Sequence, residues 1–330
     1  MKKELQIKCD KINEIAKKKN LDSIMFFNHP DKMRNPNFLY MTNSDQFGLF
    51  VLAKNEPKLF SMGWKTRERP AVKTKHVERI KNLPKLKARA GIDKSYISSD
   101  IEILIKKTTG VRFVDISDEM EKIRSIKSAN EINTIKDNCA LAGKIYKKFE
   151  PLFHEHHEEI VAKARIELEM AKHGVYPSFP TLVAAKDNII DVHHTADRTI
   201  TEYPMLVDFG IRNRLYNTDA TRTVGSRHEK IILQAIGDAE SMLKHGTKVA
   251  DIDKAVRKRL DSLQKYFTTS LGHGIGLAVH EYPRISSLSR DVLQEGMVIT
   301  IEPGIYVKSG IRIENMYLIK RDGYELLTGF

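Results

Sequence analysis

The segment from Glu202 to Val224 carries two aspartates, Asp208 and Asp219, on two apolar runs. The runs have the composition of strands, and the polar residues between them indicate a hairpin turn at Asn213-Arg214. That turn would place the two aspartates directly opposite each other, with Cβ atoms about 5 Å apart. Two carboxylates at this distance repel each other, so they must either share a proton or hold a cation between them.

A second pair of acids, Glu302 and Glu314, lies on a second predicted hairpin whose turn is expected around residues 308–310. Glu302 follows Asp208 by 94 residues, and Glu314 follows Asp219 by 95 residues. We expect the two hairpins to bring all four carboxylates together. Four negative charges are too many for one shared proton, so the sequence favours a site for two divalent cations.

One histidine, His273, suits such a site because it stands between glycines in the segment 270–276. Glycine lets the backbone approach a metal and its ligands closely. Carboxylates with one imidazole suit manganese, iron, cobalt or zinc. The same glycines could suggest a dinucleotide-binding loop, but the segment does not open a helix and lacks the third-glycine spacing.

The elements that must position these residues repeat along the C-terminal part of the chain. Ser128 and Glu131 have capping-box spacing at the start of one predicted helix. A second is expected from about His157, with Gly174 just beyond its end. Two further helices and more strand-like segments follow, so each half predicts helix, helix and strands, a pseudo-twofold repeat around one site. The residues expected on the inner face of the second helix are Ile160, Ala164, Leu168 and Ala171.

The chain of 330 residues is long enough for two domains. In residues 1–122, helix-like stretches alternate with short strand-like runs, which predicts a smaller α/β domain. This part contains no phosphate-binding loop and no His/Cys cluster. Residues 123–330 form the second predicted domain and carry all the candidate chemistry.

The formal net charge is +12. The lysines are spread along the chain without a nucleic-acid-binding motif, so we expect a solvated surface and no nucleic-acid partner. No apolar run reaches the length of a membrane span, so we expect no membrane partner. The two cysteines, Cys9 and Cys139, have no disulfide or metal spacing, which is typical of a reducing compartment and favours a cytoplasmic location.

Four strings in this order, VDFG…NTDATRT, GHGIGLAVHE, TIEPGIY and IRIEN, resemble the pita-bread metallopeptidases. That family includes prolidase, aminopeptidase P and methionine aminopeptidase, and the resemblance covers about residues 123–330. It implies an α+β fold, in which a pita-bread domain with a pseudo-twofold ααββ repeat follows a smaller N-terminal α/β domain. The segment Asn37–Thr42 resembles part of the N-terminal lobe of the prolidase and aminopeptidase P branch.

The resemblance implies a ligand set for two divalent metal ions, with manganese or cobalt favoured and iron or zinc possible. Asp208 would be a terminal ligand of one ion, and His273 and Glu302 would be terminal ligands of the other. Asp219 and Glu314 would bridge both ions. Bound metal would make a water molecule available as the nucleophile near neutral pH.

The resemblance also implies residues that contact the substrate. Counting from Phe179 places the family's upstream histidine at His193, with His194 as the adjacent rival. His280 matches a second non-ligand histidine, and Arg312 matches an arginine that borders the site. Ala278, Leu215 and the pair Lys186-Asp187 depart from residues common in the family, which leaves pocket shape and substrate preference open.

The expected function is hydrolysis of peptide bonds next to proline, most like Xaa-Pro dipeptidase. The alternative within the class is aminopeptidase P, which acts on longer peptides. The alternative from another class is a non-catalytic binding protein that kept the fold, although such relatives lose metal ligands. The family resemblance also implies a homodimer.

Overall fold

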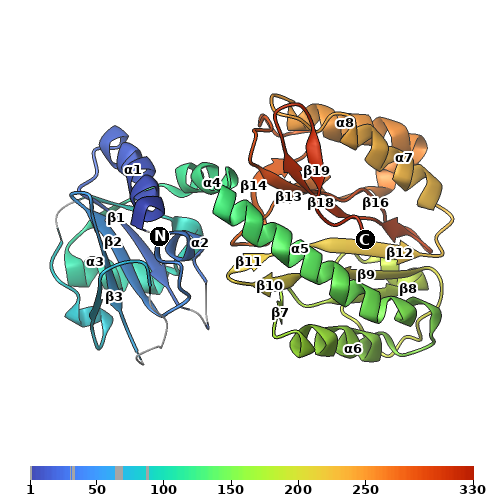
Figure 1. The fold of residues 1–330 in the computed structure, drawn as a ribbon, viewed down its shortest axis with the longest axis horizontal. Helices are drawn as coiled ribbons and strands as arrows, with labels where there is room; N and C mark the ends of the chain where they lie inside the picture. Colours follow the sequence, from blue (N-terminus) through green and yellow to red (C-terminus); the bar gives the residue numbers. More distant parts are fainter. Residues whose placement is uncertain (1, 30, 32–33, 64–69, 87–88) are drawn as a thin grey trace. The chain divides into compact units, whose positions relative to one another are not determined.

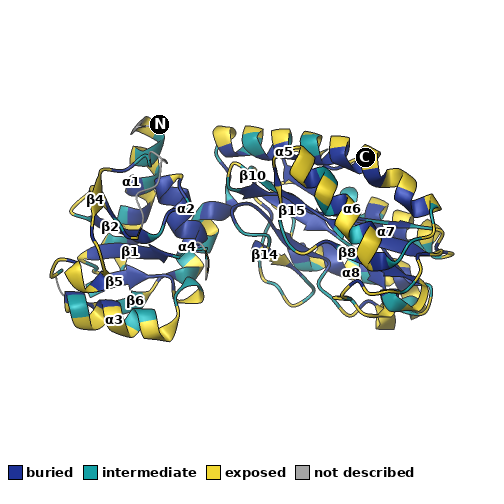
Figure 2. Ribbon diagram, turned by 90° about the horizontal axis from the view of Figure 1, so that it is seen from below, coloured by how far each residue is buried: buried dark blue, intermediate teal, exposed yellow. Residues whose placement is uncertain are grey.

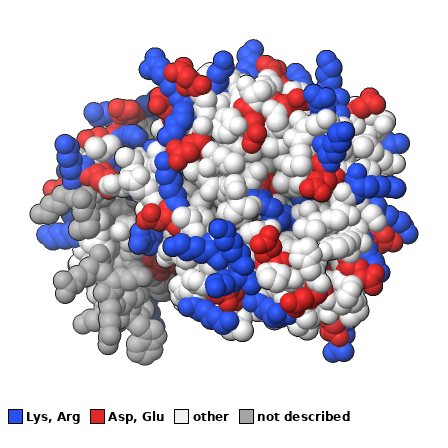
Figure 3. Space-filling view, turned by 45° about the vertical axis from the view of Figure 1, so that its right-hand side comes forward, with Lys and Arg blue, Asp and Glu red and all other residues white. Residues whose placement is uncertain are grey.

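The computed structural model describes residues 2–29, 31, 34–63, 70–86 and 89–330. The chain divides into two compact units, Met1–Arg124 and Ser125–Phe330 (Figure 1). Among the described residues, none of the helices is long and apolar enough for a membrane span. Both cysteines are buried and free. Figure 3 shows Lys and Arg side chains interspersed with Asp and Glu over the face that it draws.

The first unit is built on one six-stranded mixed sheet with the order β4-β3-β2-β1-β5-β6. Strand β1 is buried over its whole length, as expected of a central strand covered on both faces. Met25 and Phe27 of β1 share a core with Ile105 of α3, while α1 and α2 contact β1 and each other. The elements of this unit are α1 (Lys2–Lys18), β1 (Ser23–Asn28), α2 (Pro36–Thr42), β2 (Gly48–Ala53), β3 (Glu56–Ser61), β4 (Thr74–His76), η1 (Ile80–Asn82), β5 (Arg89–Ile92), η2 (Lys94–Tyr96), α3 (Ser99–Thr109), β6 (Arg112–Asp115) and α4 (Ser117–Ser125).

The second unit repeats the order helix, helix, strands, which confirms the predicted α+β class. Its first half comprises α5 (Ala129–Phe149), η3 (Glu150–His154), α6 (Glu159–Lys172), β7 (Tyr176–Pro177), β8 (Leu182–Ala185), η4 (Lys186–Ile190), β9 (Met205–Phe209), β10 (Ile211–Asn213), β11 (Tyr216–Asn217) and β12 (Ala220–Val224). Its second half comprises α7 (Glu229–Glu240), α8 (Val249–Leu260), η5 (Asp261–Tyr266), β13 (Gly272–Gly274), β14 (Glu281–Ile285), β15 (Val298–Ile301), β16 (Gly304–Ile305), β17 (Ile311–Arg312), β18 (Asn315–Ile319) and β19 (Tyr324–Leu326).

The strands of the second unit lie between the helix pair α5–α6 and the helix pair α7–α8 (Figure 1). The first pair packs on the sheet β12-β9-β8, and the second pair packs on the sheet β14-β13-β15-β18-β19. The strands are largely buried, whereas α5 and α6 carry exposed residues on their outer faces (Figure 2). Each half therefore has its own core, and the two halves meet in the middle of the unit, where the backbone of Glu314 donates a hydrogen bond to the carbonyl oxygen of Thr221 at 3.1 Å.

Local signals place the helix ends of this unit. Ser128 accepts a hydrogen bond from the backbone of Glu131, and the Glu131 carboxylate accepts one from the backbone of Ser128, which confirms the predicted capping box. Gly174 follows the end of α6 with φ of 70°, the left-handed conformation expected there.

The predicted inner face of α6 is wrong. Ile160 and Leu168 are 41% and 57% exposed, while the buried residues of the helix are Glu159, Ala162, Ile166 and Met170. The helix has two apolar stripes, and the one formed by Ala162, Ile166 and Met170 packs against β8 and the rest of the core. A buried glutamate in its first turn hides this inner stripe from a periodicity argument.

Candidate metal centre

The first hairpin brings Asp208 and Asp219 to one face of its sheet, although not in the predicted register. Strands β9 and β12 pair Asp208 with Thr221, and the turn lies at Arg214-Leu215, one residue later than expected. Asp219 therefore falls opposite Gly210, and the prediction that the aspartates are directly opposed is wrong. A turn that moves by one residue shifts each pairing partner by two residues. Because this shift in pairing is even, both side chains still point to the same face, as diagonal neighbours.

Gly210 is required for this geometry. A Cβ atom at residue 210 would lie 1.9 Å from the carbonyl oxygen of Thr218, just before Asp219. The same condition applies beside the histidine, because a Cβ at Gly272 would lie 2.1 Å from the carbonyl oxygen of Thr300. Backbone thus approaches backbone closely on both sides of the site, where only glycine fits.

The second hairpin has the direct opposition that was predicted for the first. Ile301 pairs with Asn315 on one side of the acids, and Gly304 pairs with Arg312 on the other side, in one continuous register. Glu302 and Glu314 therefore lie opposite each other. Both glutamates stand in short interruptions between named strands.

His273 lies between the two pairs of acids. Its Nε2 atom is 3.4 Å from Glu302 Oε1 and 3.8 Å from Asp219 Oδ2. Its Nδ1 lies 3.0 Å from the carbonyl oxygen of Gly274, a contact in which only the nitrogen can donate. Because this hydrogen bond places the ring proton on Nδ1, the lone pair of Nε2 is free and faces the acids. Metal-binding histidines use the same arrangement.

All five predicted ligands come together. Ligand atoms of Asp219, His273 and Glu314 lie within 4.8 Å of one another, and all three residues are buried. Glu302 adjoins them through His273, and Asp208 is close enough to raise the pKa of Asp219 and of Glu314.

The carboxylates are strained electrostatically in the metal-free protein. Burial raises the pKa of Asp219 well above its usual value, and Glu314 raises it further. Burial likewise raises the pKa of Glu314 well above its usual value, with Glu302 adding to the effect. Burial also raises the pKa of Glu302 to about 7. Burial lowers the pKa of His273 to about 3, so its imidazole is neutral.

The donor set fits divalent metal. Three buried carboxylate oxygens, Asp208 Oδ1, Asp219 Oδ1 and Glu314 Oε1, have no hydrogen-bond partner among the described residues. A buried acceptor without a partner costs about 1–3 kcal/mol, and more for a charged group. A cation in this cluster would satisfy all three oxygens and remove the repulsion between the acids.

Arg312 contacts the predicted terminal ligand directly. Its Nη2 donates to Asp208 Oδ2 at 2.6 Å, and its Nε donates to Thr221 Oγ1 at 3.1 Å. Arg312 is 3% exposed, and its Nη1 also donates to Tyr306 Oη at 3.2 Å. Arg312 therefore orients the Asp208 carboxylate through its Oδ2 atom.

The three histidines considered from the sequence have different surroundings. The ring of His280 packs edge-on against His273, with centroids 4.3 Å apart. Burial lowers the pKa of His280; Asp208 opposes this change, and His193 adds to it, which places His193 near the same group. His193 itself is exposed. His194 instead approaches Glu159, with Nε2 2.6 Å from Oε2.

Two threonines were missed by sequence reasoning. Thr221 Oγ1 donates to Glu314 Oε2 at 2.9 Å, and Thr300 Oγ1 donates to Glu302 Oε1 at 3.4 Å. Thr300 Oγ1 also accepts a hydrogen bond from the backbone of His273. The signal was present, because each threonine lies two residues from a ligand on an extended segment and so shares its face.

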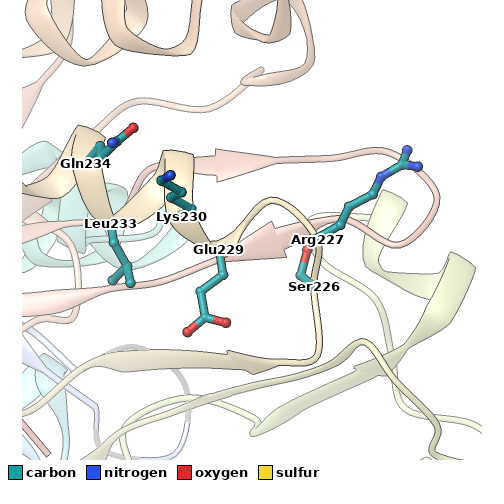
Figure 4. A pocket seen from close by; sticks show the side chains of 6 residues that line it. All are labelled: Ser226, Arg227, Glu229, Lys230, Leu233 and Gln234. Carbon is teal, nitrogen blue, oxygen red and sulfur yellow. The ribbon is translucent and has the colours of Figure 1, made fainter.

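A depression of about 630 Å³ at the start of α7 lies apart from the predicted residues (Figure 4). It contains none of the predicted ligands or histidines. Its lining consists of Ser226, Arg227, Glu229, Lys230, Leu233 and Gln234.

Comparison with known proteins identifies the family. Residues 133–321 match the model of metallopeptidase family M24. The Xaa-Pro dipeptidase of Pyrococcus horikoshii is 34% identical over 345 residues, which cover 97% of this chain and 96% of the relative. The crystal structure of the prolidase from Pyrococcus horikoshii OT3 matches with a TM-score of 0.88 and 30% identity, over 97% of each chain. The X-Pro aminopeptidase from Thermotoga maritima MSB8 matches with a TM-score of 0.83 and 26% identity, over 94% of this chain and 96% of that structure. The chain therefore belongs to metallopeptidase family M24 and has its pita-bread fold.

Proposed function

We propose that this protein is a metal-dependent Xaa-Pro dipeptidase, which hydrolyses the peptide bond before proline. The observation that carries the proposal is the convergence of four carboxylates and His273, with three buried oxygens that lack partners. The similarity to an Xaa-Pro dipeptidase over nearly the whole chain supports the same substrate class.

The five ligands divide between two divalent ions in this proposal. Asp208 would hold one ion, His273 and Glu302 would hold the other, and Asp219 and Glu314 would contact both. When bound, the ions would lower the pKa of a water molecule and polarise the substrate carbonyl. Carboxylate oxygens with one imidazole suit manganese, cobalt, iron or zinc, and the family resemblance favours manganese or cobalt among them.

The residues around the ligands bind and orient the peptide. His280 is held neutral by burial, so its imidazole can either donate a hydrogen bond to the scissile amide or accept one. His193 would stabilise the negative charge that develops on the carbonyl oxygen. Arg312 would keep Asp208 oriented toward the site through the 2.6 Å hydrogen bond.

An Xaa-Pro aminopeptidase is the second candidate, because a solved structure of that activity also matches most of the chain. A dipeptidase must bind a free carboxylate next to proline, whereas an aminopeptidase must leave that side open. Rates for an Xaa-Pro dipeptide and the matching Xaa-Pro-Xaa tripeptide decide between them. We expect faster hydrolysis of the dipeptide, and cleavage of the tripeptide alone would contradict the dipeptidase assignment.

A non-catalytic binding protein is disfavoured because all five ligands are present and lie together. Hydrolysis of no proline peptide by the manganese-loaded or cobalt-loaded protein would support that alternative. The proposal also includes two domains in each chain, a smaller N-terminal domain over residues 1–122 and a catalytic domain over residues 123–330. It further includes the assembly of two such chains into a homodimer. A cytoplasmic location is consistent with the two buried free cysteines.

A further inference from the structure

Glu159, the first residue of α6, is a buried carboxylate outside the metal centre. Its Oε1 accepts hydrogen bonds from the backbone of Ala185 at 2.7 Å and from Asn188 Nδ2 at 3.1 Å. Its Oε2 lies 2.6 Å from His194 Nε2 and accepts a hydrogen bond from the backbone of Asp197 at 3.3 Å. One carboxylate thus holds four points of a single segment, Ala185–Asp197.

The same group of side chains could suggest a metal site, because Glu159, His194 and Asp197 offer ligand atoms within 4.8 Å of one another. The hydrogen bonds argue against this reading. Both oxygens of Glu159 already have two partners, so a metal would have to displace donors that a buried carboxylate needs. Glu159 is therefore better explained as an anchor for the segment.

The anchored segment runs directly past the metal centre. The carbonyl oxygen of Val192 lies 3.5 Å from Arg312 Nη1, and the Val192 side chain packs against the core of the second half. His194, two residues later, is held by Glu159 from the first half. His193 stands between these two anchors, and its backbone donates a hydrogen bond to Asp191 Oδ1 at 3.0 Å.

This arrangement explains how an exposed histidine can have a defined position. The His193 side chain is exposed, so packing does not fix its direction. The residues on each side of it are fixed instead. Val192, before it, is held by the second half of the repeat, and His194, after it, is held by Glu159 of the first half. Loss of the Glu159 contacts would free the second anchor while leaving the metal ligands in place.

We propose that Glu159 is a positioning residue for peptide hydrolysis, which acts by fixing the segment Ala185–Asp197 so that His193 faces the metal centre. His194 is then part of the anchor and has no direct contact with substrate. This inference rests on the proposed function, because it assigns Glu159 an effect on the same reaction.

The test compares Glu159→Gln with Glu158→Gln, a neighbouring acid whose side chain makes no capping hydrogen bond. Glutamine keeps the size of Glu159 but turns an NH₂ group toward donors. We expect kcat to fall roughly 10–100-fold with KM and metal content unchanged, because losses of supporting contacts at active sites have this size. The control should retain wild-type kcat. If Glu159→Gln folds poorly, His194→Asn removes only one of the four contacts and should lower kcat in the same direction.

A double-mutant cycle separates positioning from a general structural role. In a His193→Ala background, Glu159→Gln should cause little further loss of kcat, because its effect passes through His193. An equal loss in both backgrounds would overturn the proposal, and so would a lowered melting temperature with unchanged kcat.

Failure of the proposed function would be visible separately. If the wild type hydrolyses no proline peptide, the function is wrong, and anchoring can still be measured by amide hydrogen exchange. Exchange in the segment Ala185–Asp197 should become faster in Glu159→Gln and remain unchanged in Glu158→Gln. Equal exchange in the two variants would overturn the anchoring itself.

Discussion

Removing the metal should make the stability of the protein fall as pH rises, and replacing Glu302 with glutamine should remove part of that fall. In the metal-free protein, burial raises the pKa of Glu302 from 4.5 to about 7. Between these two values the folded state binds more protons than the unfolded chain does. The free energy of unfolding therefore decreases as pH increases through this window.

The size of the effect follows from the shift in pKa. A shift from 4.5 to about 7 corresponds to about 3 kcal/mol, at about 1.4 kcal/mol for each pKa unit. The stabilising effect of the protonated form is complete below pH 4.5 and is lost once the pH exceeds the folded-state value. Glutamine does not titrate and keeps nearly the same volume. The substitution also lowers the pKa of the neighbouring acids Asp219 and Glu314, because one negative charge is removed from beside them. Their own contribution to the fall in stability becomes smaller as well.

The assay is urea unfolding of chelator-treated wild type and Glu302→Gln at several pH values, followed by circular dichroism. The stability of the variant relative to wild type should increase by up to about 3 kcal/mol from about pH 4.5 to about pH 8. Glu295→Gln, at an exposed acid, is the control and should show no such trend. A difference between wild type and Glu302→Gln that does not change with pH would refute the reasoning about buried, repelling acids.

Three further predictions concern single sites. Asp219→Ala should abolish both bound metal and peptide hydrolysis, because Asp219 lies at the centre of the acidic cluster; metal analysis of the purified variant checks this, and retained metal would contradict it. Leu215→Gly should raise the free energy of unfolding by about 1 kcal/mol, because Leu215 has φ of 75°, a left-handed conformation that is costly for a side chain; urea unfolding should show the gain, and a loss would mean that its packing matters more. Lys127→Met should lower the free energy of unfolding by about 3 kcal/mol, because Lys127 Nζ lies 3.4 Å from the buried carboxylate of Glu281, whose negative charge would lose this buried counter-charge; adding Glu281→Gln should recover much of the loss in the same assay.

Features that depend on nearby residues could be predicted from the sequence. The capping box of Ser128 and Glu131 and the glycine after α6 need only local hydrogen bonds and backbone angles. The repeat of acids at similar offsets predicted two hairpins in one unit, and the structure has both. The ordered motifs also led to the correct family, since they span both halves of the repeat.

The register of the first hairpin could not be predicted, because the turn uses residues that rarely form it. Arg214 and Leu215 both have positive φ, where asparagine and glycine are the usual choices. A turn displaced by one residue shifts the pairing partners by two. This shift changes the residue opposite Asp219, but the Asp219 side chain stays on the same face of the sheet. The prediction that both aspartates converge therefore survived an error in their pairing.

The inner face of α6 could not be predicted either, because both of its stripes are apolar. The tertiary contacts of the helix reveal which stripe faces the core, and a glutamate such as Glu159 is not expected at a buried position. The contacts of Arg312 with Asp208 and Thr221 are of the same kind, since they join residues far apart in the chain.

The close backbone contacts at Gly210 and Gly272 have a consequence for protein design. A design that copies only the five ligands onto another sheet would not reproduce this geometry if the recipient has a side chain at the position of Gly210 or Gly272. At those positions a Cβ would lie 1.9 Å and 2.1 Å from carbonyl oxygens of the crossing backbone. The five ligands alone are therefore not a portable version of the centre, because Gly210 and Gly272 contribute to it by the absence of a side chain.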